Sequence, residues 1–262
     1  MNTSQAETKN HVLIKTMGDE AVIEITGLMK SFGQQKVLKN VSLRLSKGEN
    51  LVVIGKSGSG KSVLAKCIVR LLNPDGGTIN VLGEEISALK NGSLKELRKK
   101  IGFLFQGGAL YDSMAVKQNL EFPLQRIRKN LTQKEIDEKV KEVLDHVGLS
   151  DALYKMPSQL SGGMRKRISL ARTIIVDPMI MLYDEPTTGL DPATSGEISS
   201  LINEVQIKYK TSSLIITHDI ECALATANRV IMLLDGEVYL EGELEKFERS
   251  ADALIKSFFK RS

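Results

Sequence analysis

One glycine-rich stretch decides the fold expected for this chain: Gly55-Lys56-Ser57-Gly58-Ser59-Gly60-Lys61-Ser62. It fits the pattern G-x-x-x-x-G-K-[ST], in which several backbone N–H groups converge on phosphate oxygens because glycine adopts conformations that a Cβ forbids. The apolar run 51–54 before it predicts a buried strand, and residues 63–72 after it predict a helix whose N-terminal dipole faces the phosphates. The stretch therefore predicts a nucleotide site, with Lys61 on the β- and γ-phosphates and Ser62 on Mg²⁺.

A second motif lies downstream, where the apolar run 180–183 ends in two carboxylates. Asp184, at the end of a predicted buried strand, is placed to hold the Mg²⁺ shell, and Glu185 is a candidate to orient or deprotonate a water. A different interpretation is that the two acidic residues only cap the next helix, which is common at such positions.

Polar residues also follow two other predicted strands. His218 comes after the run 214–217, and Gln106 comes after the run 101–105. Open α/β sheets bind ligands at the carboxyl ends of their strands. Polar residues that recur after three separate strands therefore favour a single shared site.

These motifs, together with two further segments, resemble the ATP-binding subunit of ABC transporters over roughly residues 23–242. The signature segment, Leu160-Ser161-Gly162-Gly163-Met164, resembles the family signature. Residues 187–192 resemble the D-loop region, and residues 217–219 resemble the switch histidine. The resemblance implies an α/β fold: a P-loop NTPase (RecA-like) core with an antiparallel β subdomain and an inserted α-helical subdomain.

The resemblance also implies roles for the matching residues. Glu185, His218 and Gln106 would be catalytic, with Glu185 either a general base or a positioning group, and Ser62, Gln106 and Asp184 would arrange Mg²⁺. The residues that would contact ATP are Phe32, which would stack on adenine, then Gly55, Lys56, Ser57, Gly58, Ser59, Gly60, Lys61 and Ser62, and finally Ser161, Gly162, Gly163 and Asp191.

In the family, the signature segment binds the γ-phosphate of a nucleotide held by the other subunit, and Asp191 would help to join the two sites. Each motif occurs once in this chain. A second copy of the ATPase subunit is therefore expected, in a homodimer that holds two ATP molecules.

A narrower resemblance lies in residues 104–113, 119–124 and 160–167, which are similar to the Mla/Mce-type lipid-transport ATPases. Met164, where most ABC proteins have Gln, is expected in this subgroup. The resemblance implies phospholipid transport between membranes, with an integral-membrane permease and an MCE-domain lipid-binding protein as partners. ATPases of amino-acid and methionine importers share much of this pattern and remain the nearest alternative.

Composition agrees with a peripheral protein. The 262 residues are 42% hydrophobic, enough for a buried core. The sequence shows no apolar stretch near the roughly 18–20 residues that span a bilayer and no signal peptide, so a place on the cytoplasmic face of the inner (cell) membrane, through the permease, is expected. The net charge of +4 is mild for a nucleic-acid binder, and no nucleic-acid partner is expected. Cys67 and Cys222 are predicted to be buried, inert thiols.

The chain divides into a polar N-terminal extension, residues 1–20, and one ATP-binding domain, residues 21–262. An edge strand is the alternative for residues 12–14. The helical subdomain is predicted at about 107–160 and a helical tail at about 243–262. The apolar residues of that tail are expected to pack on the body of the protein or, alternatively, against the second subunit.

Two other classes of protein fit the sequence less well. Soluble ABC-type ATPases that act on DNA or ribosomes usually have a long coiled-coil insertion or two cassettes in one chain, and this sequence has neither. A regulatory module that binds ATP without hydrolysis would not need both Glu185 and His218, which are present. Coupling of hydrolysis to transport is therefore the favoured interpretation.

Overall fold

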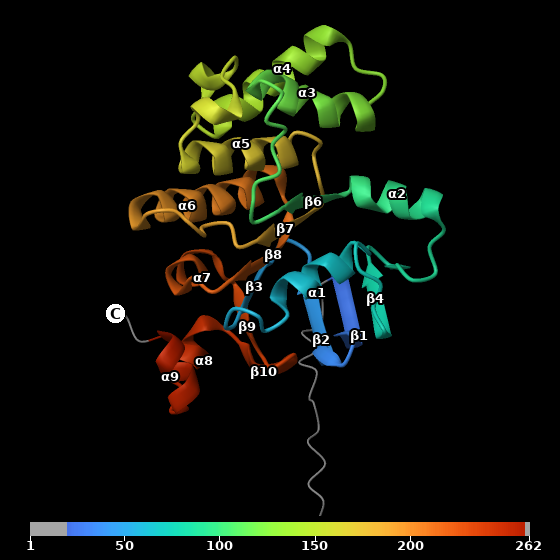
Figure 1. Ribbon diagram of the computed structural model, residues 1–262, viewed down its shortest axis with the longest axis vertical. Helices are drawn as coiled ribbons and strands as arrows, with labels where there is room; N and C mark the ends of the chain where they lie inside the picture. Colours follow the sequence, from blue (N-terminus) through green and yellow to red (C-terminus); the bar gives the residue numbers. More distant parts are fainter. Residues whose placement is uncertain (1–19, 260–262) are drawn as a thin grey trace, which may run out of the picture.

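Residues 20–259, which the computed structural model describes, form two β-sheets flanked by helices (Figure 1). The expected edge strand near residues 12–14 and the last residues of the expected tail, 260–262, lie outside the described residues. The α/β architecture predicted from the sequence is confirmed.

The larger sheet has the strand order β10-β9-β3-β8-β7-β6, in which all neighbours are parallel except β10 and β9. Residues alternate between two hydrophobic cores: Leu51 and Val53 of β3 face one core, and Val52 and Ile54 face the other. Burial on both faces explains why these strands are continuous apolar runs. The strands are β3 Asn50–Ile54, β6 Ile101–Leu104, β7 Ile180–Asp184, β8 Ser212–Thr217, β9 Arg229–Leu234 and β10 Glu237–Gly242.

The smaller sheet is antiparallel, with the order β2-β1-β4-β5. Its buried face shares one core with α1 and with one face of the larger sheet, so the strand before the glycine-rich stretch is held from both sides. The strands are β1 Ala21–Phe32, β2 Gln35–Ser46, β4 Gly76–Val81 and β5 Glu84–Glu85.

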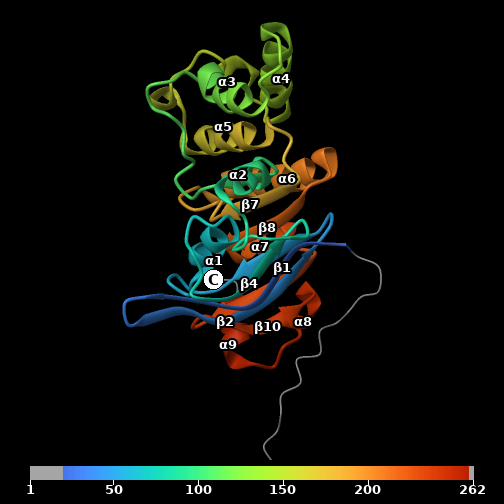
Figure 2. The same cartoon turned by 90° about the vertical axis from the view of Figure 1, so that its right-hand side faces the viewer.

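The other face of the larger sheet is covered by helices, with α3, α4 and α5 stacked beyond α6 (Figures 1 and 2). Short 3-10 turns at Ser150–Ala152 and Pro157–Gln159 connect α4 to α5. The helices are α1 Lys61–Ile68, α2 Asn91–Lys99, α3 Val116–Ile127, α4 Gln133–His146, α5 Gly162–Ile174, α6 Pro192–Tyr209, α7 Ile220–Thr226, α8 Leu244–Glu248 and α9 Ala253–Phe259.

Local signals in the sequence are found as capping and turn contacts. Thr132 and Glu135 form a capping box at the start of α4, since each side chain satisfies the other's backbone N–H. Asp235 and Gly236, with φ of 48° and 83°, form the tight turn of the β9–β10 hairpin. The helix predicted at 63–72 was misplaced: α1 begins at Lys61 and ends at Ile68, because the backbone leaves helical geometry by Arg70 (φ 53°).

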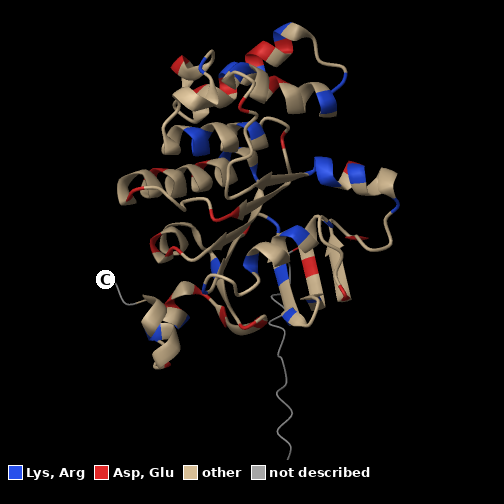
Figure 3. Ribbon diagram, viewed as in Figure 1, with Lys and Arg blue, Asp and Glu red and all other residues tan. Residues whose placement is uncertain are grey.

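The C-terminal helices pack on the body of the same chain. Phe247 of α8 and Ile255 of α9 are 1% and 2% exposed and belong to the core beneath the large sheet. Of the two alternatives for the apolar tail, the structure therefore has the first. The second half of α2 is rich in basic residues (Figure 3), with Leu97 buried among them, and Arg98 donates to the carbonyl oxygens of Val69 and Arg70.

Candidate active site

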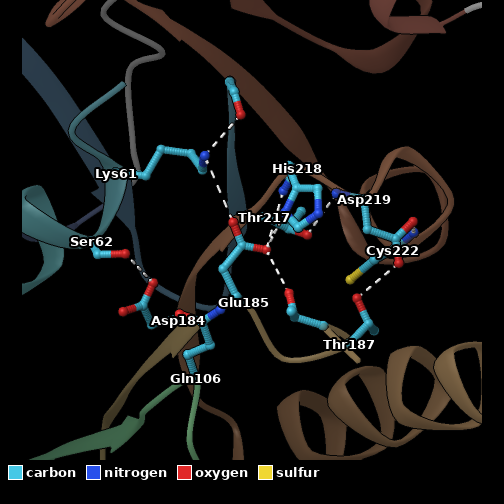
Figure 4. Close-up of polar contacts among 12 residues, drawn as sticks. Lys61, Ser62, Gln106, Asp184, Glu185, Thr187, Thr217, His218, Asp219 and Cys222 are labelled. Carbon is cyan, nitrogen blue, oxygen red and sulfur yellow. Dashed lines mark hydrogen bonds and ion pairs between the residues drawn. The ribbon is translucent and has the colours of Figure 1, made fainter. Parts of the chain in front are cut away.

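The strands β3, β8, β7 and β6 are adjacent and parallel, so their carboxyl ends meet at one edge of the large sheet. The phosphate loop, residues 55–62, follows β3, and Asp184 ends β7. His218 follows β8, and Gln106 comes two residues after β6, one residue farther from the strand than the sequence predicted. The topology therefore brings together residues that are up to 163 positions apart in the sequence (Figure 4).

The backbone of the phosphate loop depends on its glycines. A Cβ on Gly55 would lie 2.3 Å from the Leu233 carbonyl oxygen, so only glycine fits there. Gly58 and Gly60 have φ of 82° and 101°, in the left-handed region, and Gly60 begins α1. The buried hydroxyl of Ser59 has no hydrogen-bond partner among the described residues. A glycine-shaped loop with an unsatisfied hydroxyl at a helix N-terminus fits a bound phosphate group.

Lys61 is buried and its ammonium group folds back on the phosphate loop. Its Nζ donates to the carbonyl oxygens of Gly55 at 2.8 Å and Lys56 at 3.1 Å, and lies 3.7 Å from Oε1 of Glu185. Burial lowers the pKa of Lys61, and the carboxylates of Glu185 and Asp184 oppose that shift. The ammonium group thus lies within the phosphate loop, at the place where phosphates are expected.

Ser62 and Asp184 meet across the edge of the sheet. The Ser62 hydroxyl donates to Oδ1 of Asp184 at 2.7 Å, and the carboxylate is buried. A hydroxyl and a carboxylate are hard oxygen ligands, and Mg²⁺ sites in proteins often use one or two such groups together with phosphates and water. The pair therefore fits the Mg²⁺ position that the sequence predicted.

Glu185 lies at the centre of the site. Its Oε2 accepts from Nδ1 of His218 at 2.7 Å and from the Thr188 hydroxyl at 3.1 Å. Its φ of 54° is left-handed, a strained conformation for a residue with a side chain and one that often occurs at functional sites. Lys61 and His218 approach this carboxylate from two sides (Figure 4).

The alternative that the acidic pair only caps a helix is wrong. The helix that follows, α6, is capped by Asp191, whose Oδ1 accepts from the Thr194 backbone N–H at 3.0 Å. Asp184 and Glu185 instead contact Ser62, Lys61 and His218.

The signature segment and Asp191 form a second group. Ser161 is the N-cap of α5, and its hydroxyl accepts from the Met164 backbone N–H at 3.2 Å. Gly162 and Gly163 face Leu190 and Thr194, beside the start of α6. Within residues 20–259, no hydrogen bond or ion pair joins this group to the phosphate loop. The structure therefore brings the residues at the strand ends together with the phosphate loop, and it leaves the signature segment and Asp191 apart from them.

Phe32 lies at the end of β1, where the turn to β2 begins. The residue is 47% exposed, and Nζ of Lys30 lies 5.5 Å from the ring centroid. An exposed aromatic ring has a face available for stacking, so the role on adenine that the resemblance implies stays a prediction compatible with this position.

Two residues that contact the site were not predicted from the sequence as site residues. Lys166, on α5, is buried and donates to backbone carbonyls next to the site, and Thr187 donates from its hydroxyl to Asp219 at 2.8 Å. A signal for Lys166 was present, since it is three and four positions before the buried residues Ser169 and Leu170 and so shares their helix face. The two cysteines are free and buried, and burial raises the pKa of each thiol to about 11, which agrees with the predicted inert role.

Known proteins resemble this chain over most of its length. A profile of the ABC transporter family matches residues 38–188. The chain is 38% identical to the methionine import ATP-binding protein MetN of Clostridium tetani, over 91% of this chain and 80% of that protein. It is 39% identical to the probable ribonucleotide transport ATP-binding protein mkl of Mycobacterium tuberculosis, over 90% and 66%.

A third relative is the intermembrane phospholipid transport system ATP-binding protein MlaF of Haemophilus influenzae, 37% identical over 92% of this chain and 91% of that protein. Among solved structures, the dimeric structure of MJ0796, a bacterial ABC transporter cassette, has a TM-score of 0.78 and 32% identity, over 85% of this chain and 98% of that one. The same cassette bound to ADP and Pi has a TM-score of 0.77. The chain therefore belongs to the ABC transporter family, as an ATP-binding subunit that hydrolyses ATP.

Proposed function

We propose that this ABC transporter ATPase powers the movement of phospholipid between membranes through a partner permease. The observation that supports hydrolysis as its task is the Glu185 carboxylate, buried at the edge of the sheet between Lys61 and His218 and next to Asp184. Support for the lipid cargo comes from MlaF, which this chain matches over 91% of MlaF's length, and from Met164 in the signature segment.

In this proposal each residue of the edge has one task. The phosphate loop and Lys61 hold the phosphates of ATP, and Ser62, Asp184 and Gln106 arrange Mg²⁺. Glu185 accepts a proton from water or orients it, and His218 holds the Glu185 carboxylate through the 2.7 Å contact. Phe32 stacks on the adenine.

The working form is proposed to be a homodimer. The signature segment and Asp191 lie apart from the phosphate loop of their own chain, so a second copy is needed to bring the two groups together across an interface. The two solved structures of the similar cassette MJ0796 are described as dimeric, which supports this arrangement.

The proposed place of the protein is the cytoplasmic face of the inner membrane. No helix within the described residues is long and apolar enough to cross a bilayer. Attachment would come through an integral-membrane permease, with an MCE-domain lipid-binding protein in the same assembly.

A methionine or other amino-acid importer is the second candidate. The chain is 38% identical to MetN and 37% identical to MlaF, so sequence identity does not separate the two candidates. The ATPase subunit handles nucleotide rather than cargo, so the site described above serves either transporter.

The two candidates are separated by what the ATPase binds. Tagged Glu185→Gln protein, which is expected to hold ATP without turnover, is captured from native membranes with ATP present. Recovery of a multi-span permease together with an MCE-domain protein and phospholipid is the expected result. Recovery of a permease with an amino-acid-binding protein would overturn the lipid cargo and keep the ATPase role, and recovery of ribosomes or DNA alone would overturn the transport role.

A further inference from the structure

Lys166 is a buried cation that none of the motifs explains. It lies on α5, five residues after Ser161, and is 8% exposed. Its Nζ donates to the carbonyl oxygen of Gln106 at 2.6 Å and to that of Glu185 at 3.3 Å. One ammonium group thus joins the backbones of two residues that come from different strand ends and whose side chains belong to the proposed site.

A buried lysine in this position destabilises the fold unless specific contacts compensate for its desolvation. Burial lowers the pKa of Lys166, while the nearby carboxylates of Asp184 and Glu185 favour its charged form. An apolar residue on the same helix face would avoid the desolvation of a cation. The contacts made by Nζ are directed at two specific carbonyls, which supports a positioning task more than a packing one.

The two backbones that Lys166 joins are in conformations that need support. Glu185 has φ of 54°, and Ala109, three residues after Gln106, has φ of 52°, both left-handed conformations of residues with a side chain. Residues in this region persist only when surrounding contacts hold them. The other restraints on the Glu185 backbone are its N–H bond to Ile216 at 2.8 Å and a long bond of 3.4 Å from Thr188 to its carbonyl.

The same face of α5 holds the rest of the loop after β6. Ser169 lies so close to Gly108 that a Cβ there would be 2.7 Å from its hydroxyl oxygen. Arg172 donates from Nη1 to the Ala109 carbonyl at 3.1 Å. Lys166, Ser169 and Arg172 are spaced by three residues, so they face one side of the helix, and only Lys166 also reaches the Glu185 backbone.

We propose that Lys166 is a positioning residue for ATP hydrolysis, which ties the Gln106 and Glu185 backbones together and so keeps their side chains in register with each other. The inference rests on the roles proposed above for Gln106 and Glu185. Because α5 begins with the signature segment, Lys166 also links that segment to the water-handling residues of its own chain. A displacement of about 1 Å at such residues costs about a hundredfold in rate.

The test compares Lys166→Met, Lys166→Arg and the matched control Arg172→Met in the full-length protein, by ATP titration of phosphate release. Lys166→Met keeps the length of the side chain and loses the charge and donors; its kcat is expected to fall about 30-fold or more, with KM for ATP within about threefold of the parent. Lys166→Arg keeps a cation and recovers most of that loss. Arg172→Met breaks an α5 contact to the same loop and is expected to stay within about threefold in kcat.

Two results would overturn the inference. One is a Lys166→Met protein whose kcat stays within about threefold of the parent. The other is an equal loss in Lys166→Met and Arg172→Met, or a loss of ATP affinity and thermal stability that parallels the loss of kcat, because each would indicate general structural support. Glu185→Gln is measured beside them: if it retains turnover, the proposed role of Glu185 fails, whereas an inactive Glu185→Gln with a normal Lys166→Met rejects only the role of Lys166.

Discussion

The edge of the large sheet and the starts of α5 and α6 differ in how the chain completes them. At the edge, side chains contact one another directly: Ser62 bonds to Asp184, and Lys61 and His218 meet Glu185. At the helix starts, Ser161 and Asp191 use their side chains to cap their own helices. One chain thus brings into contact the residues proposed to handle phosphate and water, whereas Ser161 and Asp191, within the described residues, are engaged in capping α5 and α6. In the proposed homodimer, a second copy of the chain would bring its signature segment to this edge.

The largest effect is expected when only the edge of the large sheet is disabled. Glu185→Gln keeps the shape of the side chain and removes its basic oxygen, so ATP turnover is expected to fall about 10³-fold, as for loss of a general base. ATP affinity is expected to stay within about threefold of the parent. Phosphate release and equilibrium ATP binding measure the two quantities. Turnover at the parent rate would remove Glu185 from the chemistry.

The next change disables the helix start alone. Ser161→Arg places a bulky cation at the N-terminus of α5, so turnover that needs two copies is expected to fall about a hundredfold, while ATP binding by one copy persists. Ser161→Ala is the control for the lost cap, which costs about 1 kcal/mol in the free energy of unfolding. The two variants should unfold at similar temperatures. Full activity of Ser161→Arg would mean that the signature segment does not act across an interface.

Lys61→Ala tests the contribution of the edge of the sheet to ATP binding. Hydrogen bonds from a charged donor contribute about 1.5–3 kcal/mol, so ATP affinity is expected to fall about 10- to 100-fold. Lys66→Ala, a change of a lysine farther along α1, is the matched control and is expected to leave affinity within about threefold. Titration of ATP against both proteins checks this, and an unchanged affinity for Lys61→Ala would contradict the phosphate assignment.

The smallest effect is expected at Asp191, where capping and any role between subunits can be separated. Asp191→Ala loses the cap of α6 and is expected to lower the free energy of unfolding by about 1 kcal/mol, seen as a melting temperature lower by about 2–4 °C. Asp191→Asn keeps a good capping side chain and should melt like the parent. If Asp191→Asn loses turnover at unchanged stability, the charge of Asp191 acts between subunits. If all three proteins melt at the same temperature, the Asp191 cap does not contribute to stability.

Local patterns predicted most of the elements. Buried strands were found where apolar runs are continuous, the start of α4 where Thr132 precedes Glu135, and the β9–β10 hairpin at Asp235-Gly236, because each of these signals depends on neighbours in the chain. The end of α1 was misjudged, since its apolar pattern continues past Ile68 while the backbone turns at Arg70.

The candidate site was predicted in part for the same reason. Ser62, Asp184 and His218 were found from motifs and from their positions at strand ends. Lys166 was not, although it shares a helix face with Ser169 and Leu170, because helical spacing does not tell whether a long side chain ends in water or at two buried carbonyls. Its contacts with Gln106 and Glu185 depend on how α5 packs over the sheet.

The α/β fold, the phosphate loop and the residues that could bind ATP were predictable without the structure, because short motifs and the family resemblance they carry specify them. The tertiary structure alone decided which of those residues meet. Ser62 and Asp184 are 122 residues apart and contact only because β3, β8 and β7 are neighbours in one parallel sheet. It also decided that the helical tail packs on its own chain, since burial of Phe247 and Ile255 depends on long-range packing rather than on their neighbours in sequence.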